Sequence, residues 1–486
     1  MTEHFDVLVV GAGISGVGAG YHLQTQCPDK TFVILDGLDS FGGTWLTHRY
    51  PGIRSDSDLY TFGYRFKPWT GAPIATADEI LKYMDEVIEE NHLAEHIRYN
   101  HWIESSSWSS KDKKWTIKGK DKVSGKPIVF TCNFLWMCQG YYKHAEGYTP
   151  TWDGMENFEG QLVHPQTWPE DLDYKDKKVL VIGSGATAAT VVPAIASECE
   201  HITVLQRSPT YFIPGVNVNE TADLLRKLDI KEEWIHEIVR KEILFNQDEF
   251  TRRAIEEPEV VKEELLTMVK SLLPEGYDMK HFTPTYRPWQ QRVAFVPEGD
   301  IFAGISAGKA DMVTDEIERF TEKGVLTKSG QTLEADIIVT ATGFNLCVLG
   351  DINFSVDDKP IDFADTVTYR GMMFTDVPNM AWVFGYFRAS WTLRVDLVSD
   401  FVCRLLNHMD ESGVKSVMPL LGKSEHNMPR LDWIDEENFN PNYLKRSMHL
   451  MPKCGDKHEW RHTQDYWRER EELPAVDLSD AVFKYA

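Results

Sequence analysis

The feature that most constrains this chain is a short unit that occurs twice: an apolar strand, a glycine-rich turn, a helix and a second strand. The first copy has an apolar run at residues 5–10, the turn Gly11-Ala12-Gly13-Ile14-Ser15-Gly16, and a second strand that ends at Asp36. In this arrangement the first glycine permits the bend, the second lets a diphosphate approach the backbone, and the third lets the helix meet the sheet. The diphosphate rests on the helix N-terminus, where free N–H groups attract anions. The unit therefore predicts a dinucleotide site.

The second copy lies 172 residues further along, counted from Gly11 to Gly183. An apolar strand at 178–182 leads into Gly183-Ser184-Gly185-Ala186-Thr187-Ala188, and a later strand at 201–205 is followed by Gln206-Arg207-Ser208. An acid such as Asp36 accepts a hydrogen bond from a free ribose 2′-hydroxyl, whereas an arginine beside a hydroxyl suits a 2′-phosphate. The first site is therefore expected to hold FAD or NAD, and the second NADP.

The segments around these units predict an α/β fold with two Rossmann-like dinucleotide-binding domains, one for FAD and one for NADP. Residues 102–140 alternate apolar and polar side chains, as antiparallel strands do, and residues 220–273 change to helical spacing. The apolar run at 335–343 predicts a buried strand that returns the chain to the first domain. The expected division is a first domain in 1–145 and 335–410, a linker in 146–175, a second domain in 176–334 with a helical insertion at about 217–290, and a C-terminal tail in 411–486 without predicted elements.

Composition excludes several classes of partner. The 75 acidic and 51 basic residues give a formal net charge of −24, and such a surface repels nucleic acid. No stretch of about 20 apolar residues is free of charge, which argues against a transmembrane segment. Glu3 and Asp6 stand where a secretion signal would carry lysines. Seven scattered cysteines resemble reduced thiols, so we expect a cytoplasmic protein.

Three weaker signals favour other classes of protein, and their context argues against each. A disulfide reductase needs a nearby cysteine pair, whereas the closest pair here, Cys132 and Cys138, lies six residues apart. The run 304–308 matches the G-x-S-x-G turn of serine hydrolases, but helical and extended segments flank it in the reverse of the required order. His92 and His96 lie four residues apart on an expected helix without a ligand partner at suitable spacing, so we expect no metal site.

The linker before the second unit carries a further pattern. Residues 158–169, from Phe158 to Pro169, read F-x-G-x-x-x-H-x-x-x-W-P. This resembles the fingerprint of type I Baeyer–Villiger monooxygenases, and a second family pattern runs from Gly43 and Trp45 to Asp56. The segments 50–60 and 390–397 look like the ethionamide-activating monooxygenase subgroup. The matching motifs extend from about residue 7 to residue 406.

The resemblance implies FAD and NADPH as cofactors and assigns residues to them by motif. Those implied for FAD are Gly11, Gly13, Ser15, Gly16 and Asp36, with Thr44 and Trp45 beside the flavin. Those implied for NADP are Gly183, Ser184, Gly185, Ala186, Thr187 and Ala188, with Arg207 and Ser208 on the 2′-phosphate. Further cofactor contacts are expected from Arg54, Ser55, Asp56, Ile103 and Ala189.

Two positions depart from the family pattern. The family usually has glutamate where Asp36 stands, and the shorter acid can still accept a ribose hydrogen bond. The family often has a lysine just before its active-site arginine, and this chain has Gln291 there. One positive charge is therefore missing from the expected phosphate site, which weakens the expectation of strict NADPH preference.

The same resemblance places the active-site arginine at Arg292, with Asp56 to orient it. In the family, NADPH reduces FAD, and O₂ then yields a C4a-peroxide that attacks a ketone to give an ester or lactone. A permanently charged guanidinium stabilises the peroxide anion without donating its own proton. His164 is expected to pack in the linker or act at a hinge. Trp391 is a candidate for lining the substrate site.

Two alternatives remain at this point. One is S- or N-oxygenation of sulfides, thioamides or amines by a C4a-hydroperoxide. The other is a redox-sensing NADP-binding protein without catalysis, which would need neither Arg292 nor Asp56. The expected partners are O₂ and a small ketone or sulfide substrate.

Overall fold

The first glycine turn follows the central strand of a nine-stranded sheet in the computed structural model, which describes residues 2–486. Strand β1 (Glu3–Val10) runs parallel to β2 (Phe32–Leu35) on one side and to β6 (Pro127–Met137) on the other. Its last four residues are buried because both faces of the sheet are covered. Helix α1 (Ile14–Gln26) begins directly after the turn and packs against the long helix α10 (Trp391–Glu411).

Half of this sheet is antiparallel, as the alternation at 102–140 predicted. Strand β4 (His101–Ser109) pairs with β5 (Lys114–Asp121), which pairs with β6. The sheet is completed by short strands on both sides, namely β3 (Ile97–Arg98), β19 (Asn353–Val356), β20 (Lys359–Pro360) and β23 (Met380–Trp382). Besides α1, the α-helices of this lobe before residue 100 are α2 (Thr44–Thr47), α3 (Leu59–Phe62) and α4 (Ala77–Glu90).

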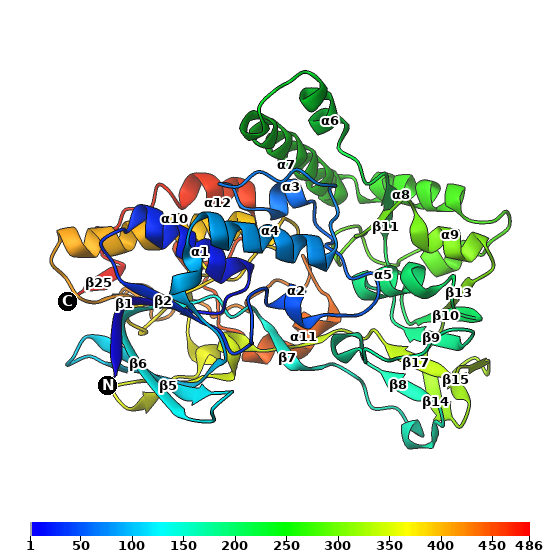
Figure 1. The fold of residues 1–486 in the computed structure, drawn as a ribbon, viewed down its shortest axis with the longest axis horizontal. Coiled ribbons are helices and arrows are strands. Elements are labelled where there is room, and N and C mark those ends of the chain that lie inside the picture. Colours follow the sequence, from blue (N-terminus) through cyan, green and yellow to red (C-terminus); the bar gives the residue numbers. More distant parts are fainter. Residues whose placement is uncertain (1) are drawn as a thin grey trace.

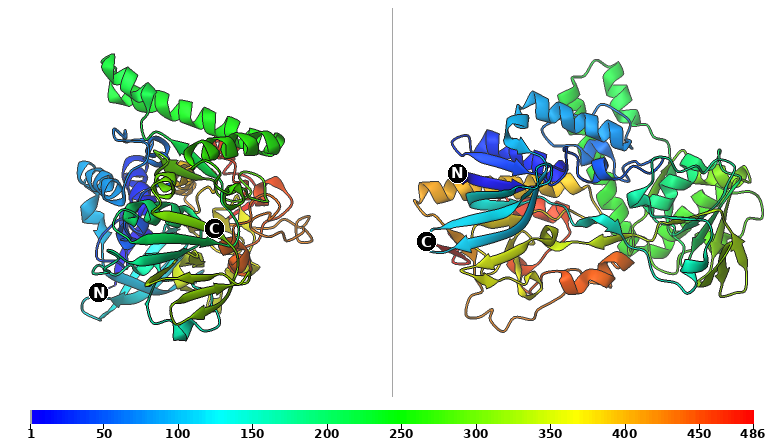
Figure 2. Two further views of the ribbon diagram at one scale, coloured as in Figure 1. Left: turned by 90° about the vertical axis from the view of Figure 1, so that its right-hand side faces the viewer. Right: turned by 60° about the horizontal axis from the view of Figure 1, so that its bottom comes forward.

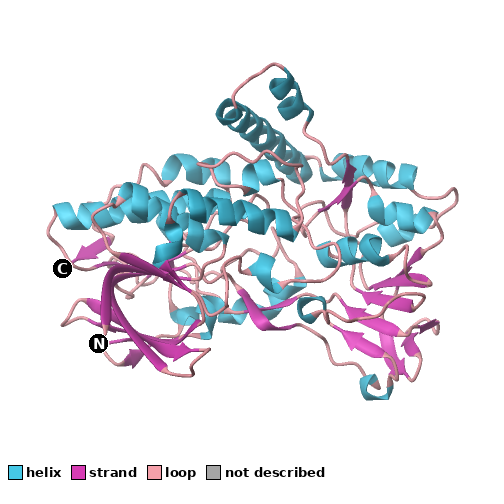
Figure 3. Ribbon diagram, viewed as in Figure 1, coloured by secondary structure: helices cyan, strands magenta, loops and turns pink. Residues whose placement is uncertain are grey.

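The second glycine turn belongs to a separate five-stranded parallel sheet, in the right-hand lobe of Figure 1. Its strand order is β13 (Ala310–Thr314), β10 (His201–Gln206), β9 (Lys178–Ile182), β17 (Ile337–Thr340) and β8 (Gln161–Val163). Helices α5 (Ala186–Ile195) and α9 (Asp300–Ser306) pack together beside it, and an antiparallel sheet of β14 (Ile317–Thr321), β15 (Gly324–Thr327) and β16 (Thr332–Glu334) adjoins it. Figure 3 shows the two groups of strands as separate magenta bodies. The predicted class, α/β with two Rossmann-like domains, is confirmed.

One predicted boundary is wrong. The strand expected to return the chain to the first domain is β17, and it pairs with β9 and β8 inside the second sheet. The return comes later, at β18 (Phe344–Leu346), which pairs antiparallel with β7 (Tyr142–Gly147) between the lobes (Figure 1). An apolar run indicates a buried strand but does not say which sheet buries it.

A helical insertion interrupts the second lobe where the helical spacing predicted it. It lies between β11 (Phe212–Gly215) and β12 (Ala294–Pro297), which pair parallel. Its helices are α6 (Glu220–Lys227), α7 (Glu232–Glu256) and α8 (Pro258–Leu272). Figures 1 and 2 show α6 and α7 projecting from the body of the protein. Buried Arg240 of α7 holds the insertion on the first lobe, because it donates to the carbonyls of Tyr60 and Gly63 at 2.6 and 3.0 Å.

The segment after residue 411, for which no elements were predicted, is folded onto the first lobe. It contains β24 (Val417–Pro419), α11 (Asn442–Ser447), α12 (Tyr466–Glu472) and β25 (Phe483–Tyr485). Trp460 and Phe483 belong to the same hydrophobic core as β1. Glu469 of α12 is buried beside the fully buried Arg394 of α10, and also accepts a 2.6 Å hydrogen bond from Tyr386. The remaining strands of the lobe are β21 (Thr368–Tyr369) and β22 (Met373–Phe374).

The two histidines considered as a metal pair do not share a helix. Helix α4 ends at Glu90, and His92 has a left-handed backbone with φ 54°. His96 lies in a following 3₁₀ turn, where its ring stacks on Phe32 at a centroid distance of 4.0 Å. Within residues 2–486, no helix is both long and apolar enough to cross a membrane.

We predict that Glu469→Ala destabilises the protein by about 3–5 kcal/mol, because it leaves the Arg394 guanidinium buried without its carboxylate. The measurement is chemical unfolding followed by tryptophan fluorescence. Glu471→Ala is the matched control on the same helix, since Glu471 pairs with Arg470 at the surface and its removal should cost less than about 1 kcal/mol. Equal effects of the two changes would contradict the role given to the buried pair.

Candidate active site and nucleotide sites

The backbone of the first turn leaves no room for side chains at two of its glycines. Gly11 has φ 102°, and a Cβ there would lie 2.6 Å from the carbonyl oxygen of Cys138. A Cβ on Gly16 would lie 1.7 Å from the carbonyl oxygen of Gly11. Gly13 differs, because the nearest atom to a Cβ there is 3.7 Å away. Nothing in the protein therefore demands glycine at position 13, and the open space suits a diphosphate that contacts the backbone.

Asp36 joins this turn to the end of β2. Its carboxylate accepts hydrogen bonds from the backbone N–H groups of Ala12 and Leu38 at 2.6 and 2.7 Å. Burial nevertheless raises the pKa of Asp36 above its ordinary value, because desolvation outweighs the two hydrogen bonds. Each oxygen keeps a second lone pair, so the side chain can still accept a hydrogen bond from a ribose hydroxyl.

Thr44 and Trp45, expected beside the flavin, and Ser55 and Ile103, expected to contact a cofactor, come from separate segments of the first lobe. Thr44 begins α2, and Trp45 packs edge-on against Phe62 at 5.7 Å. Ile103 is buried in β4. Ser55 is also buried, and its hydroxyl closes a local turn by donating to the carbonyl of Ser57 at 2.7 Å.

Arg54 makes contacts between the lobes. Its guanidinium pairs with Asp300 of α9 at 2.7 Å and donates to the carbonyl of Ala189 in α5 at 3.3 Å. Both partners belong to the second lobe, so the side chain expected to bind a cofactor holds the two nucleotide domains against each other.

Arg292 and Asp56, expected to act together, form an ion pair. The guanidinium Nη1 lies 2.5 Å from Oδ2 of Asp56, and both side chains are about one-third exposed, at 35% and 31%. Asp56 raises the pKa of Arg292 well above its ordinary value, more than burial lowers it. Arg292 precedes β12 of the second lobe, whereas Asp56 lies in the loop before α3 of the first. The pair is thus built from both lobes, and its guanidinium keeps a permanent positive charge beside the Asp56 carboxylate.

Three tyrosines surround this pair, and sequence reasoning missed all of them. The hydroxyls of Tyr141 and Tyr142 lie 2.6 Å apart, and the ring of Tyr443 is 6.3 Å from that of Tyr142. Burial raises the pKa of each, while Arg292 acts in the opposite direction. All three therefore stay protonated near neutral pH. Tyr141 and Tyr142 follow β6 at its carboxyl end, a position that could have drawn attention, but Tyr443 of α11 stands in no recognised motif.

Trp391 connects this cluster to the first glycine turn. Its indole Nε1 donates to the Ser15 hydroxyl at 2.8 Å, and its ring stacks on Tyr141 at 5.0 Å with an interplanar angle of 11°. Of the tryptophans in the sequence, it was the one proposed to line the substrate site. It lies between the FAD turn and the tyrosines beside Arg292.

The second turn repeats the geometry of the first. Gly183 has φ 118°, and a Cβ there would lie 2.3 Å from the carbonyl oxygen of Ala341. A Cβ on Gly185 would meet nothing within 4 Å. Ser184 donates to the carbonyl of Ser208 at 3.3 Å. The second turn therefore has the same open space over its middle glycine.

The remaining residues expected to hold NADP lie around this turn. Ala186, Thr187 and Ala188 form the first turn of α5. Arg207 and Ser208 are exposed at the carboxyl end of β10. The residues expected for NADP thus lie together at the carboxyl end of the second sheet. Ala189, expected to contact a cofactor, uses its carbonyl to accept a hydrogen bond from Arg54.

His164 of the fingerprint makes packing contacts. Its Nε2 lies 3.1 Å from the carbonyl oxygen of Gly343, and its Nδ1 accepts from the N–H of Gln166 at 3.1 Å. Together these bonds define a neutral ring protonated on Nε2, and burial lowers its pKa. The ring presses so closely on Gly147 that a Cβ there would lie 1.9 Å from it. His164 therefore fixes the two strands that connect the lobes, β7 and β18.

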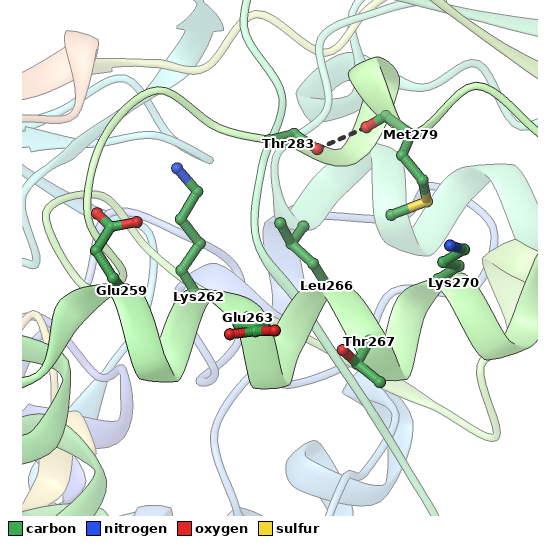
Figure 4. Close-up of a pocket in the computed structure, with 8 residues that line it drawn as sticks. All are labelled: Glu259, Lys262, Glu263, Leu266, Thr267, Lys270, Met279 and Thr283. Carbon is green, nitrogen blue, oxygen red and sulfur yellow. Dashed lines mark hydrogen bonds between the residues drawn. The ribbon is translucent and has the colours of Figure 1, made fainter.

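Two surface hollows lie outside the cofactor residues. One, of about 370 Å³, follows the outer side of α8 and is lined by residues such as Lys262, Leu266 and Met279 (Figure 4). The second, of about 750 Å³, includes Trp168 of the fingerprint and Arg49. None of the residues expected to bind FAD or NADP lines either hollow, so we place the site at the glycine turns and Arg292.

Comparison with known proteins shows the family to which this chain belongs. Residues 73–225 match the model of a family described as flavin-binding monooxygenase-like, and residues 9–71 match an NAD(P)-binding Rossmann-like domain. The chain is 45% identical over 471 residues to the FAD-containing monooxygenase EthA of Mycolicibacterium smegmatis, covering 96% of this chain and 94% of the relative. The chain belongs to the flavin-binding monooxygenase family. This confirms the family resemblance seen in the sequence.

Other relatives of this monooxygenase span it from end to end. The probable FAD-binding monooxygenase AlmA of Acinetobacter sp is 41% identical over 487 residues, covering 100% of this chain and 97% of the relative. A solved structure titled OTEMO complex with FAD and NADP covers 100% of both chains with a TM-score of 0.77 at 18% identity. An NADP-bound steroid monooxygenase covers 99% of both chains with a TM-score of 0.76 at 22% identity. These structures establish the shared fold.

We predict that Gly185→Ala leaves the monooxygenase folded but weakens its binding of NADP⁺ about tenfold or more, equivalent to about 1.4 kcal/mol. The added methyl meets no protein atom within 4 Å and enters the space expected for the diphosphate. Isothermal titration with NADP⁺ measures the effect. Gly304→Ala in α9 is the control, because its Cβ would make only ordinary contacts, at 3.7 Å from Ala196 beyond the other end of α5 and 3.8 Å from Ala310. Unchanged NADP⁺ affinity in Gly185→Ala would contradict this placement of the diphosphate.

Proposed function

We propose that this monooxygenase uses FAD and NADPH to insert one oxygen atom of O₂ next to a ketone carbonyl, giving an ester or lactone. The observation that carries the proposal is the Arg292–Asp56 ion pair, which is assembled from both lobes beside the tyrosines and Trp391. Bound FAD and NADPH would supply the electrons and the activation of O₂. The residues described here bind, orient and stabilise charge.

The two turns fit these cofactors. Gly13 and Gly185 each leave open space above a helix N-terminus, where a diphosphate gains backbone N–H donors. Asp36 fits a ribose with free hydroxyls, and exposed Arg207 with Ser208 fits a 2′-phosphate. The acid at one site and the cation at the other support FAD in the first lobe and NADP in the second.

Arg292 is suited to stabilise negative charge on the oxygen that attacks the carbonyl. Its charge is permanent, and Asp56 fixes its orientation through the 2.5 Å contact. A preorganised cation costs no reorganisation when charge develops during the reaction. The hydroxyls of Tyr141 and Tyr142 lie close by as neutral donors and can hold a carbonyl oxygen in place.

Oxygenation of sulfides, thioamides or amines is the competing reaction, and it requires a protonated oxygen donor in place of an anion. NADPH-dependent O₂ uptake with a panel of ketones and sulfides, with the products identified, distinguishes the two. Esters as main products support the proposal. Sulfoxides without esters across the panel would refute it.

We predict that Arg292→Ala retains FAD and is still reduced by NADPH, because its cation is not needed for hydride transfer. Ester formation should fall by about two to three orders of magnitude, with NADPH diverted to H₂O₂. The measurement is the balance of NADPH consumed against ester and H₂O₂ formed. Arg319→Ala is the control, since that exposed arginine pairs only with Glu318. Ester yields near the unmodified level in Arg292→Ala would overturn the mechanism, and Arg292→Lys should restore little because it lacks the planar fork.

We predict that Arg207→Ala weakens NADPH about tenfold to a hundredfold and NADH hardly at all, because only NADPH carries a 2′-phosphate. The ratio of the two dissociation constants is the measurement, so each nucleotide serves as the control for the other. A parallel loss for both nucleotides would remove Arg207 from the 2′-phosphate site.

A further inference from the structure

A second arginine, Arg446 of α11, lies at the edge of the nucleotide site. Its guanidinium carbon is 3.4 Å from the centre of the Tyr148 ring, and its Nη2 donates to the carbonyl of Phe344 at 3.4 Å. The same nitrogen lies 3.8 Å from the position that a Cβ on Gly343 would take. These contacts hold the guanidinium just past the carboxyl end of β17.

The order of strands places the second glycine turn between two cations. Strand β9 leads into Gly183 and lies between β10, which ends before Arg207, and β17, which ends before Gly343 and Arg446. All three strands are parallel, so their carboxyl ends lie along one edge of the sheet. Arg207 and Arg446 therefore stand on opposite sides of the turn.

Neither arginine forms an ion pair in the part of the chain that the structure describes. Among residues 2–486, no carboxylate oxygen lies within ion-pairing distance of either guanidinium, although the chain carries a net charge of −24. Burial lowers the pKa of Arg446, and the positive charge of Arg207 lowers it further. Two like charges beside the open space at Gly185 are complementary to an anion between them.

We propose that Arg446 is a second cation of the nucleotide site and contacts the diphosphate of the nicotinamide nucleotide resting on the Gly183–Ala188 turn. The inference rests on the proposed NADP site in the second lobe. An arginine suits this task because its planar fork can give two hydrogen bonds to phosphate oxygens. Stacking on Tyr148 holds that fork in place before the nucleotide arrives.

The diphosphate assignment has a signature that a 2′-phosphate contact would not share. NADP⁺ and NAD⁺ both carry a diphosphate, whereas only NADP⁺ carries a 2′-phosphate. Removal of Arg446 should therefore weaken both nucleotides by the same factor and leave their ratio unchanged. Removal of Arg207 should change the ratio.

The test is isothermal titration of the full-length FAD-loaded protein with NADP⁺ and with NAD⁺. Arg446→Met keeps an unbranched apolar chain against Tyr148 and should weaken both nucleotides about tenfold or more, the scale expected for a charge-assisted contact. Arg446→Lys keeps the charge without the planar fork, so its affinity for both nucleotides should lie between those of the unmodified protein and Arg446→Met. Lys445→Ala is the matched control, because it removes a positive charge from the same helix. Unlike Arg446, Lys445 pairs with a carboxylate, that of Glu436 at 3.7 Å.

The outcomes separate this inference from the proposed nucleotide site. If Arg207→Ala weakens NADP⁺ selectively while Arg446→Met and Arg446→Lys bind as the unmodified protein does, the nucleotide site stands and the role of Arg446 is wrong. A selective loss of NADP⁺ in Arg446→Met would also overturn the diphosphate assignment. If neither arginine affects binding, the nucleotide site itself is misplaced. Flavin content and thermal unfolding of each variant establish whether it is folded. If Arg446→Met does not fold, the nucleotide affinities of Arg446→Lys decide the question.

Discussion

The site depends on one loop of the first lobe, residues 50–58, and its contacts with the second lobe. Asp56 pairs with Arg292, and Arg54 pairs with Asp300. Two residues before Arg54, Gly52 has φ 74° and comes so close to α5 that a Cβ would lie 2.7 Å from that of Ala194. The loop can make these contacts only while the lobes are docked. The orientation of the Arg292 guanidinium and the relative placement of the two glycine turns are therefore set by the same few residues.

This dependence explains why the site combines rigid and exposed parts. The glycine turns follow buried strands and are fixed by backbone contacts, whereas Arg292 and Asp56 keep about one-third of their side chains open to solvent. A substrate needs access to the charged pair, and a diphosphate needs a backbone already shaped to receive it. Trp391 and Tyr141 connect the rigid first glycine turn to the exposed ion pair, because Trp391 donates to the Ser15 hydroxyl and stacks on Tyr141 near Arg292.

Sequence reasoning succeeded where the determining interactions are local. Gly11 and Gly183 are required by their own φ angles and by neighbouring backbone, so the spacing of the glycines alone predicts both turns. It failed where an element depends on distant partners. The run containing β17 is equally apolar whichever sheet it joins, and only its pairing with β9 shows that it belongs to the second lobe. Tyr443 likewise gains its role from long-range packing, because nothing in the residues around it encodes contact with Tyr142.

The folding of the C-terminal segment onto the first lobe has a consequence for synthesis of the protein. Both glycine turns have been synthesised once translation reaches residue 190, and Arg292 and Asp56 once it reaches residue 300. Tyr443 and Glu469 are added much later. A nascent chain thus possesses both glycine turns long before it possesses Tyr443, which packs near Tyr142, and Glu469, which pairs with Arg394 of α10. The order of translation therefore leaves the packing around Tyr142 and Arg394 to the last stage of assembly, after both glycine turns have been made.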